Sequence, residues 1–407
     1  MTRFLRTVST RRLMAMIAGL IAAIAAGTAI AVAAAGSGPV PKRQSLARAI
    51  RAALAAPAVQ GISARISFTN HLIDASDIQG ADPILSGATG RLWLSNGHGL
   101  RLELQGDNGD AQVVVNNRSF WVYDPSSNTV YEGTVPASAQ KARASHKQRE
   151  TLPGVAQIQT DLNHLVKHVA LSGAIPTDVA GQPTYTVRVS PRHDGGLLGA
   201  AELAWDAVRG VPLRIAVYAR GNSSPVLELK ATDISYGRVS SGVFRISPPR
   251  GAKVVKVSTT SAAADHTQSR LRRQAKGHAD VSGVSAVQRH LPFTLAAPAR
   301  LVGLPRQSVT LLDWQGHPAA LVTYGQNLGG IAVIEQTASS TKQLPSTSTS
   351  GGDRRGLTLP TVSINGATGQ ELDTALGTMV RFTRARVTYT VVGSVPAAAA
   401  DAAARAL

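Results

Sequence analysis

The spacing of hydrophobic residues changes from helical to strand-like near residue 59. Leu46, Ile50 and Leu54 recur every four residues within 45–56, which predicts a short amphipathic helix that ends at Pro57. After this point apolar and polar residues alternate, and Asn-Gly or Asp-Asn-Gly sequences separate the alternating segments, as is typical of tight hairpins. We therefore predict an antiparallel meander with strands at 63–69, 90–94, 100–104, 111–115, 119–123 and 129–131.

A polar and basic segment separates this meander from further strands. Residues 137–149 are predicted to form a mobile loop, and 155–169 has helical spacing. Pro248 and Pro249 cannot continue a central strand, so we expect the first domain, 44–256, to end here. Its remaining strands are expected at 169–171, 184–190, 201–205, 212–219 and 226–235.

The composition changes after the double proline. Residues 257–290 are rich in Ala and Ser and carry a basic cluster, which predicts a linker or a loose helix. A small α+β module is expected over 291–396, with a polar loop at 345–353 and a short helix or turn at 369–382. An Ala-rich tail, 397–407, is predicted to dock on it as a helix. The strands of this module are expected at 309–314, 319–324, 330–335, 356–364 and 386–392.

The first 36 residues have the pattern of an export signal. Arg3, Arg6, Arg11 and Arg12 precede an apolar run, Leu13–Ala35, that carries no charge. Such a flank predicts a cytoplasmic N-terminus and export of the rest of the chain. The length of the run favours an uncleaved signal anchor, whereas small residues before Gly36 fit a cleaved signal peptide. We expect a single-pass protein of the cell membrane with its bulk outside the cytoplasm, or a secreted protein if the signal is cleaved.

Composition narrows the partners and the chemistry. The chain has no cysteine, which excludes disulfides, thiol catalysis and cysteine-ligated metal. Its net charge is +18, but an exported protein is not expected to bind nucleic acid. An anionic membrane surface, acidic wall polymers or an acidic protein are the expected partners. The alternative is that arginine merely replaces lysine in a GC-rich genome.

The sequence contains no convincing catalytic or metal-binding motif. His164 and His168 share one face of the predicted helix, with Asp161 one turn earlier, but Lys167 stands where a zinc protease needs its glutamate base. Ser339 to Lys342 matches S-x-x-K without a partner K-T-G sequence. Nucleophile-elbow and phosphate-binding loop motifs are absent. We predict a non-enzymatic protein with no metal and no cofactor.

The predicted meander points instead to ligand binding. An antiparallel sheet with one apolar face must cover that face, and only the helices at 45–56 and 155–169 are expected in the first domain. Incomplete cover would leave an apolar groove. Aromatic residues within the predicted strands are candidates to line it, and the alternative is that they are ordinary core: Trp93, Trp121, Tyr123, Trp205 and Tyr218.

Three segments resemble one protein family. Phe120-Trp-Val-Tyr-Asp-Pro-Ser-Ser-Asn-Thr-Val-Tyr131 resembles the W-x-Y-D-x-x-S-N-x-V-Y hairpin of actinobacterial LolA-like proteins, which group with RseB-type N-terminal domains. Trp205-Asp-Ala-Val-Arg-Gly-Val-Pro-Leu-Arg214 is similar to the family's G-x-P-L hairpin. Phe244-Arg-Ile-Ser-Pro-Pro-Arg-Gly-Ala-Lys-Val254 is similar to its closing strand. The resemblance covers roughly 44–256.

The resemblance implies a fold and a function. The fold would be mainly β (α+β): a curved antiparallel half-barrel sheet with a helical lid, followed by a smaller α+β module. The function would be extracytoplasmic binding of acyl chains, lipoprotein or hydrophobic segments, as a carrier or sensor. The alternative is a membrane-anchored regulator of a sigma/anti-sigma system, with an anti-sigma factor or other membrane protein as partner. A cell-envelope hydrolase is a third, less favoured hypothesis. The resemblance supplies no catalytic residues.

Overall fold

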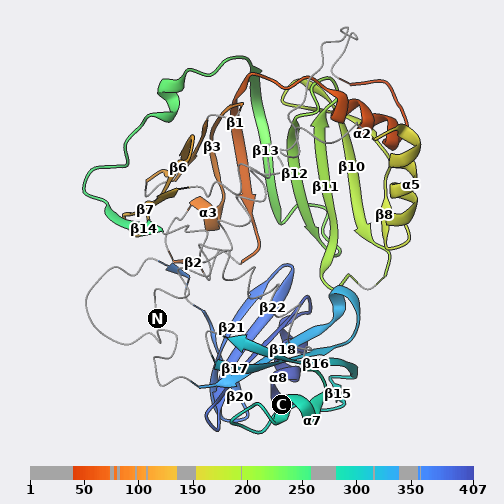
Figure 1. The fold of residues 1–407 in the computed structure, drawn as a ribbon, viewed down its shortest axis with the longest axis vertical. Coiled ribbons are helices and arrows are strands. Elements are labelled where there is room, and N and C mark those ends of the chain that lie inside the picture. Colours follow the sequence, from red (N-terminus) through yellow and green to blue (C-terminus); the bar gives the residue numbers. More distant parts are fainter. Residues whose placement is uncertain are drawn as a thin grey trace.

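The computed structural model confirms a mainly β protein with few helices (Figure 1). It describes residues 40–73, 78–79, 83–96, 99–106, 109–134, 153–193, 195–257, 281–314, 317–338, 356–357 and 359–407. The predicted export signal, the 137–149 loop, the 345–353 loop and the S-x-x-K sequence lie outside these residues. In the described part of the chain, no helix has the length and hydrophobicity needed to cross a membrane.

The first unit is built on one long, curved sheet. Its strand order is β14-β7-β6-β5-β4-β3-β1-β13-β12-β11-β10-β8, and β9 pairs with β10. Neighbours are antiparallel apart from β14, which pairs with β7 in parallel. The strands are β1 (Gly61–Asn70), β3 (Ala88–Ser95), β4 (Gly99–Gln105), β5 (Ala111–Asn116), β6 (Ser119–Asp124), β7 (Thr129–Thr134), β8 (Val169–Leu171), β9 (Ile175–Val179), β10 (Gln182–Pro191), β11 (Leu198–Asp206), β12 (Pro212–Ala219), β13 (Leu227–Tyr236) and β14 (Lys253–Val257).

Both predicted helices of the first unit are present. Helix α2 (Leu46–Ala55) begins after Ser45, whose Oγ accepts a hydrogen bond from the Arg48 N–H at 3.4 Å, as expected of an N-cap. Helix α5 (Val155–Leu165) ends four residues before the predicted limit, because β8 begins at Val169. A one-turn helix, α3 (Pro83–Ser86), was not predicted. In Figure 1, α2 and α5 lie at the β8–β11 end of the sheet.

Strand register separates the side chains of this sheet into two faces. Ala64 pairs with Leu92, which pairs with Leu102, so these three side chains share one face. The same face bears α2, since Trp205 and Tyr185 pack against Ala49 of that helix. Ile84 of α3 also packs against it. We call this side the helix-bearing face.

The opposite side, which we call the outer face, is crossed by the end of the first unit. A short 3-10 helix, η2 (Ser241–Phe244), and the extended residues after it pack on β4 to β6. The chain then turns at the double proline and enters β14 at the sheet edge (Figure 1). The double proline therefore lies outside the strands, as the sequence indicated.

The second unit contains an eight-stranded sheet with the order β15-β16-β17-β18-β23-β22-β21-β20. Helices α7 (Val284–Gln288) and α8 (Ala397–Arg405) pack against one face, and Val287, Ala400 and Ala403 are fully buried there. The strands are β15 (Arg300–Leu301), β16 (Leu304–Trp314), β17 (His317–Tyr324), β18 (Ile331–Thr337), β20 (Thr361–Ile364), β21 (Ala367–Thr374), β22 (Gly377–Arg384) and β23 (Val387–Gly393).

The prediction of a short helix or turn at 369–382 was wrong. The structure has the hairpin of β21 and β22 there. Buried Val380 and Phe382 alternate with the half-buried side chains of Met379 and Arg381, which is the period of a strand with one core face. The prediction of a docked C-terminal helix agrees with α8.

The two units meet at backbone hydrogen bonds. The Ala375 N–H donates to the carbonyl of Leu72 at 2.8 Å, and the Leu197 N–H donates to the carbonyl of Ser394 at 3.0 Å. Leu72 follows β1 and Leu197 precedes β11. A two-stranded sheet also joins β2 (Ile78–Gln79) to β19 (Gly356–Leu357).

Candidate functional site

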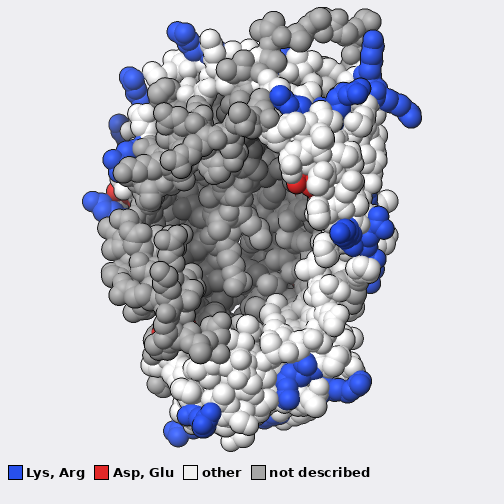
Figure 2. Space-filling view, turned by 45° about the vertical axis from the view of Figure 1, so that its right-hand side comes forward, with Lys and Arg blue, Asp and Glu red and all other residues white. Residues whose placement is uncertain are grey.

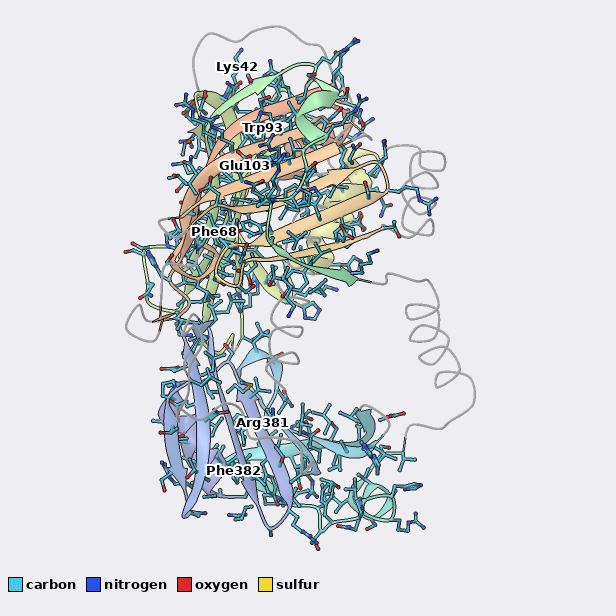
Figure 3. All side chains as sticks on the ribbon, turned by 90° about the vertical axis from the view of Figure 1, so that its left-hand side faces the viewer. Lys42, Phe68, Trp93, Glu103, Arg381 and Phe382 are labelled. Carbon is cyan, nitrogen blue, oxygen red and sulfur yellow. The ribbon has the colours of Figure 1, made fainter. Side chains whose placement is uncertain are left out.

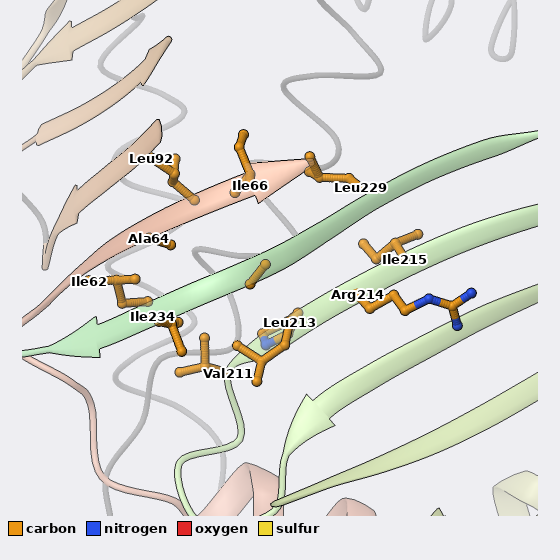
Figure 4. A pocket seen from close by; sticks show the side chains of 12 residues that line it. Ile62, Ala64, Ile66, Leu92, Val211, Leu213, Arg214, Ile215, Leu229 and Ile234 are labelled. Carbon is orange, nitrogen blue, oxygen red and sulfur yellow. The ribbon is translucent and has the colours of Figure 1, made fainter. Parts of the chain in front are cut away.

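The helix-bearing face has an aliphatic floor around a small cavity. The cavity measures ≈ 40 Å³. Its walls come from β1, β3, β12 and β13, and Figure 4 shows the side chains of Ile62, Ile234 and Leu213 converging on it. The lining is aliphatic apart from one arginine: Ile62, Ala64, Ile66, Leu92, Val211, Pro212, Leu213, Arg214, Ile215, Leu229, Ala231 and Ile234.

Arg214, the charged member of this lining, is held by acids rather than left free for a ligand. Its Nη1 donates to Glu202 at 2.6 Å and its Nε to Glu228 at 2.6 Å. The Tyr218 hydroxyl also donates to Glu202, at 2.9 Å. Burial alone would raise the pKa of Glu202, but the hydrogen bonds from Arg214, Arg188 and Tyr218 lower it overall. The cavity therefore presents an aliphatic surface with no unpaired charge among the described lining residues.

Of the described helices, α3 packs on this floor through Ile84, whereas α2 packs on Tyr185 and Trp205, and α5 packs on α2. Helix α2 buries Ala47 and Ala49, whereas α5 buries only Ile158 and leaves Val155 and Leu165 more than 40% exposed. Leu203 of β11, on the same face as α2, is also exposed. In Figure 2, the described Lys and Arg side chains gather at the periphery of the visible surface.

Of the five predicted binding residues, Trp205 alone lies on the helix-bearing face. Its ring is buried beside Tyr185 at 6.2 Å between centroids, beneath Ala49 of α2. Gly210 follows in the G-x-P-L turn, with φ +66, and a Cβ there would lie 2.5 Å from the Ala53 carbonyl oxygen. Trp205 and this turn therefore seat α2 on the sheet, and Trp205 does not line the cavity.

Tyr218 and Trp93 lie on the outer face. Tyr218 follows Val217 on β12 and belongs to the ion network, with the Arg188 guanidinium 4.5 Å from its ring centroid. Trp93 stands between Leu92 and Leu94 on β3, so its side chain points away from the floor. The Arg101 guanidinium lies 5.1 Å from the Trp93 ring centroid (Trp93 is labelled in Figure 3).

Trp121 and Tyr123 also lie on the outer face. Trp121 packs with Val114 and Val130 beneath Ile246, and its Nε1 donates to the Ile246 carbonyl at 3.3 Å. Tyr123 packs at the edge of this cluster. Trp121 also borders a cleft of ≈ 650 Å³ between β5–β7 and residues 244–248. The structure thus separates the predicted aromatic residues rather than bringing them to one groove.

We expect Trp93→Leu to have a small effect that distinguishes the two faces. The substitution removes one half-exposed ring and its contact with Arg101, which predicts a loss of about 0.5–1 kcal/mol in the free energy of unfolding. Because Trp93 is on the outer face, binding of a fluorescent fatty acid should not change. Urea unfolding and a fluorescence titration measure the two quantities. If Trp93→Leu weakens fatty-acid binding without changing the free energy of unfolding, Trp93 contacts the ligand and the expectation is wrong.

The predicted histidine pair does not gather further ligands. His164 and His168 lie at the end of α5 and in the turn after it. In the part of the chain that the structure describes, no group of three or more His, Asp or Glu side chains is placed to hold a metal ion.

The aliphatic floor residues were not identified from the sequence, although their signal was present. Ile62, Ala64 and Ile66 alternate along β1, as do Leu92 and Leu94 along β3. The same alternation along β3 places Trp93, which lies between Leu92 and Leu94, on the opposite face. The pairing of β1 with β13, which brings Ile234 and Leu229 to the floor, has no local sequence signal because 156 residues, 71–226, separate the strands.

Comparisons with known proteins give structural neighbours at low similarity. Neither a family model nor a curated protein sequence matches the chain. The structure of Pseudomonas aeruginosa MucB in complex with MucA is 15% identical, with a TM-score of 0.37, over 88% of this chain and 94% of that chain. A LolA superfamily protein from Nitrosomonas europaea is 10% identical, with a TM-score of 0.18, over 46% and 90%. An uncharacterized protein from Thermus thermophilus is 12% identical, with a TM-score of 0.30, over 49% and 91%.

Proposed function

We propose that this chain is a non-catalytic, extracytoplasmic binding protein that holds an apolar ligand, such as an acyl chain, on the helix-bearing face of its first sheet. The observation that carries this proposal is the aliphatic floor, where strands distant in sequence converge around a cavity. Removing apolar surface from water is favourable by about 25 cal/mol per Å², so such a floor binds a ligand without a reactive group. The arginine flank before the apolar run supports the location.

The cavity as it stands is too small for an acyl chain, so binding requires neighbouring segments to move. Of α2 and α5, helix α5 is better suited to move, because it packs on α2 and buries a single side chain. A segment with few buried apolar contacts opens at low free-energy cost. Ligand entry would therefore displace α5 while α2, seated on Trp205 and Tyr185, stays in place.

A pair of variants on one strand tests this function. Ala64 and Ser67 lie on β1 but on opposite faces. Ala64→Phe fills the cavity and should weaken binding of the fluorescent fatty acid cis-parinaric acid about tenfold or more, whereas Ser67→Phe should leave it unchanged. Overpacking a core position costs about 1–3 kcal/mol, so folding of both variants is checked by circular dichroism.

Two results would overturn the proposal. One is a wild-type protein that shows no saturable binding of cis-parinaric acid. The other is a folded Ala64→Phe protein that binds the probe as wild type does. A cysteine introduced at Leu165 provides an independent measure, because the chain has no other cysteine. A fluorophore on it should change its emission when ligand displaces α5.

A further inference from the structure

The eight-stranded sheet of the second unit has two faces of different character. The face that packs on α7 and α8 is fully buried, with Val333, Val380 and Val391 at 0% exposure. The side chains on the other face are half-buried or exposed, apart from those of Ala319 and Thr388, which are buried. We call this other side the second face. It takes no part in the binding proposed for the first unit.

An apolar row runs across the strands of the second face. Register places Ala332, Val392, Met379 and Leu372 side by side on β18, β23, β22 and β21. Neighbouring strands are about 4.8 Å apart, so the row is about 14 Å long. Val392 is 40% exposed. Such a row is an accessible apolar strip on the sheet.

Arg381 stands beside this row without a counter-charge. Thr390 and Gln370 flank it in the register, both uncharged. Among the residues that the structure describes, none forms an ion pair or a side-chain hydrogen bond with its guanidinium. Burial lowers the pKa of Arg381, and no neighbouring acid offsets this. Figure 3 labels the residue on the second unit, next to core residue Phe382.

An unpaired, half-buried cation costs stability unless something compensates it. Replacing such a group with an apolar residue of similar size is often neutral or stabilising. The other arginine of β22 differs, since the Arg384 guanidinium lies over the rings of Phe382 and Tyr389. A ligand that supplies a negative charge beside Arg381 would offset the stability cost of burying its guanidinium.

We propose that the second face binds an anionic amphiphile, whose carboxylate pairs with Arg381 and whose acyl chain lies along the row from Leu372 to Ala332. The planar guanidinium presents two parallel N–H donors to a carboxylate. The apolar row accepts a chain that runs across the strands. The second unit would then recognise the charged head group of a lipid, whereas the uncharged floor of the first unit would bind the apolar chain alone.

The test compares a fatty acid with its methyl ester, because the two probes share the chain and differ in charge. The full chain carrying Ala64→Phe, in which the floor of the first unit is blocked, should bind cis-parinaric acid more tightly than its methyl ester. Hydrogen bonds to charged groups are worth about 1.5–3 kcal/mol, which corresponds to a tenfold to hundredfold weaker binding of the acid by Arg381→Leu. Binding of the ester should not change.

Control variants separate the charge from the apolar surface and from folding. Thr383→Leu adds an apolar side chain on the same strand and face and should keep the preference for the acid. Arg381→Lys should keep part of that preference. Arg381→Leu without ligand should unfold in urea at a midpoint no lower than that of wild type.

Two outcomes would overturn the inference. The first is an Arg381→Leu protein that still prefers the acid over the ester. The second is a loss of stability in Arg381→Leu, which would show that the guanidinium stabilises the fold. If Ala64→Phe abolishes binding of both probes while Arg381→Leu changes neither, the floor is the ligand site and the second face is not.

Discussion

Replacing Asp206 with alanine is expected to lower the free energy of unfolding by about 3–5 kcal/mol, because it removes a buried, charged acceptor and hydrogen bonds to charged groups contribute about 1.5–3 kcal/mol each. The carboxylate is fully buried at the turn between β11 and β12. It accepts hydrogen bonds from the N–H groups of Val208 and Arg209, both at 2.8 Å, and from the Tyr236 hydroxyl at 2.7 Å. Burial and this carboxylate raise the pKa of Tyr236, so its hydroxyl remains a donor. Alanine leaves these donors unpaired in the interior.

Asp124 provides a matched control for Asp206. It occupies the same position in the turn between β6 and β7, where its Oδ1 accepts from the Ser126 N–H at 2.9 Å and the Ser127 N–H at 3.3 Å. Water reaches this half-buried turn and can replace a lost acceptor. Asp124→Ala should therefore cost about 0.5–2 kcal/mol, as for other capping side chains. Equal losses in urea unfolding for the two variants would contradict the role given to burial.

Glu335→Gln is expected to stabilise the protein at alkaline pH by up to about 3 kcal/mol, at 1.36 kcal/mol per pKa unit. Glu335 has no exposed surface, and its Oε2 accepts from the Ala296 N–H at 2.9 Å. Burial raises the pKa of Glu335 from 4.5 to about 7, and this hydrogen bond offsets only part of the shift. Among the residues that the structure describes, neither Glu335 Oε1 nor the buried hydroxyl of Tyr324 has a hydrogen-bond partner. At alkaline pH the folded protein must hold an unpaired buried carboxylate.

The direction of the pH dependence follows from proton binding. Between about pH 4.5 and 7 the folded state keeps the Glu335 proton and the unfolded state releases it. The free energy of unfolding therefore falls as pH rises through this window and is level above it. Glu335→Gln removes this slope. Glu202→Gln is the control with opposite sign, because the pKa of Glu202 is lowered and its stabilisation is lost as pH falls. A wild-type protein whose urea midpoint is flat from pH 5 to 7 would refute the assignment.

The sequence was a good guide to the strands and a poor guide to what they bury. Alternation located most strands of the first sheet, and Ser45 with Pro57 bounded α2. Strand β9 (Ile175–Val179) was missed because Pro176 and Asp178 interrupt its pattern. At 369–382 polar residues such as Gln370 and Arg381 obscured the strand pattern, whose core face in β22 is formed by Val380 and Phe382.

The candidate site depended on long-range pairing, which local patterns do not contain. From the sequence, Trp121 and Trp93 were predicted to line the groove because they are aromatic residues in strands. The floor is instead aliphatic, and strand register places both rings on the outer face. The burial of Asp206 and Glu335 arises from segments distant in sequence, Tyr236 for the first and Ala296 for the second. The unpaired state of Arg381 follows only once its strand neighbours are known.

The pairing of β1 with β13 sets the order in which the first unit can fold. The hairpins from β3 to β7 form between strands that are close in sequence. Strand β1 lies inside the sheet, and its second edge pairs with β13, residues 227–236. Closing a loop of about 160 residues raises contact order and slows folding. Until β13 is in place, the edge of β1 is exposed. Such an edge pairs readily with foreign strands, so the chain is most open to aggregation before residues 227–236 join the sheet.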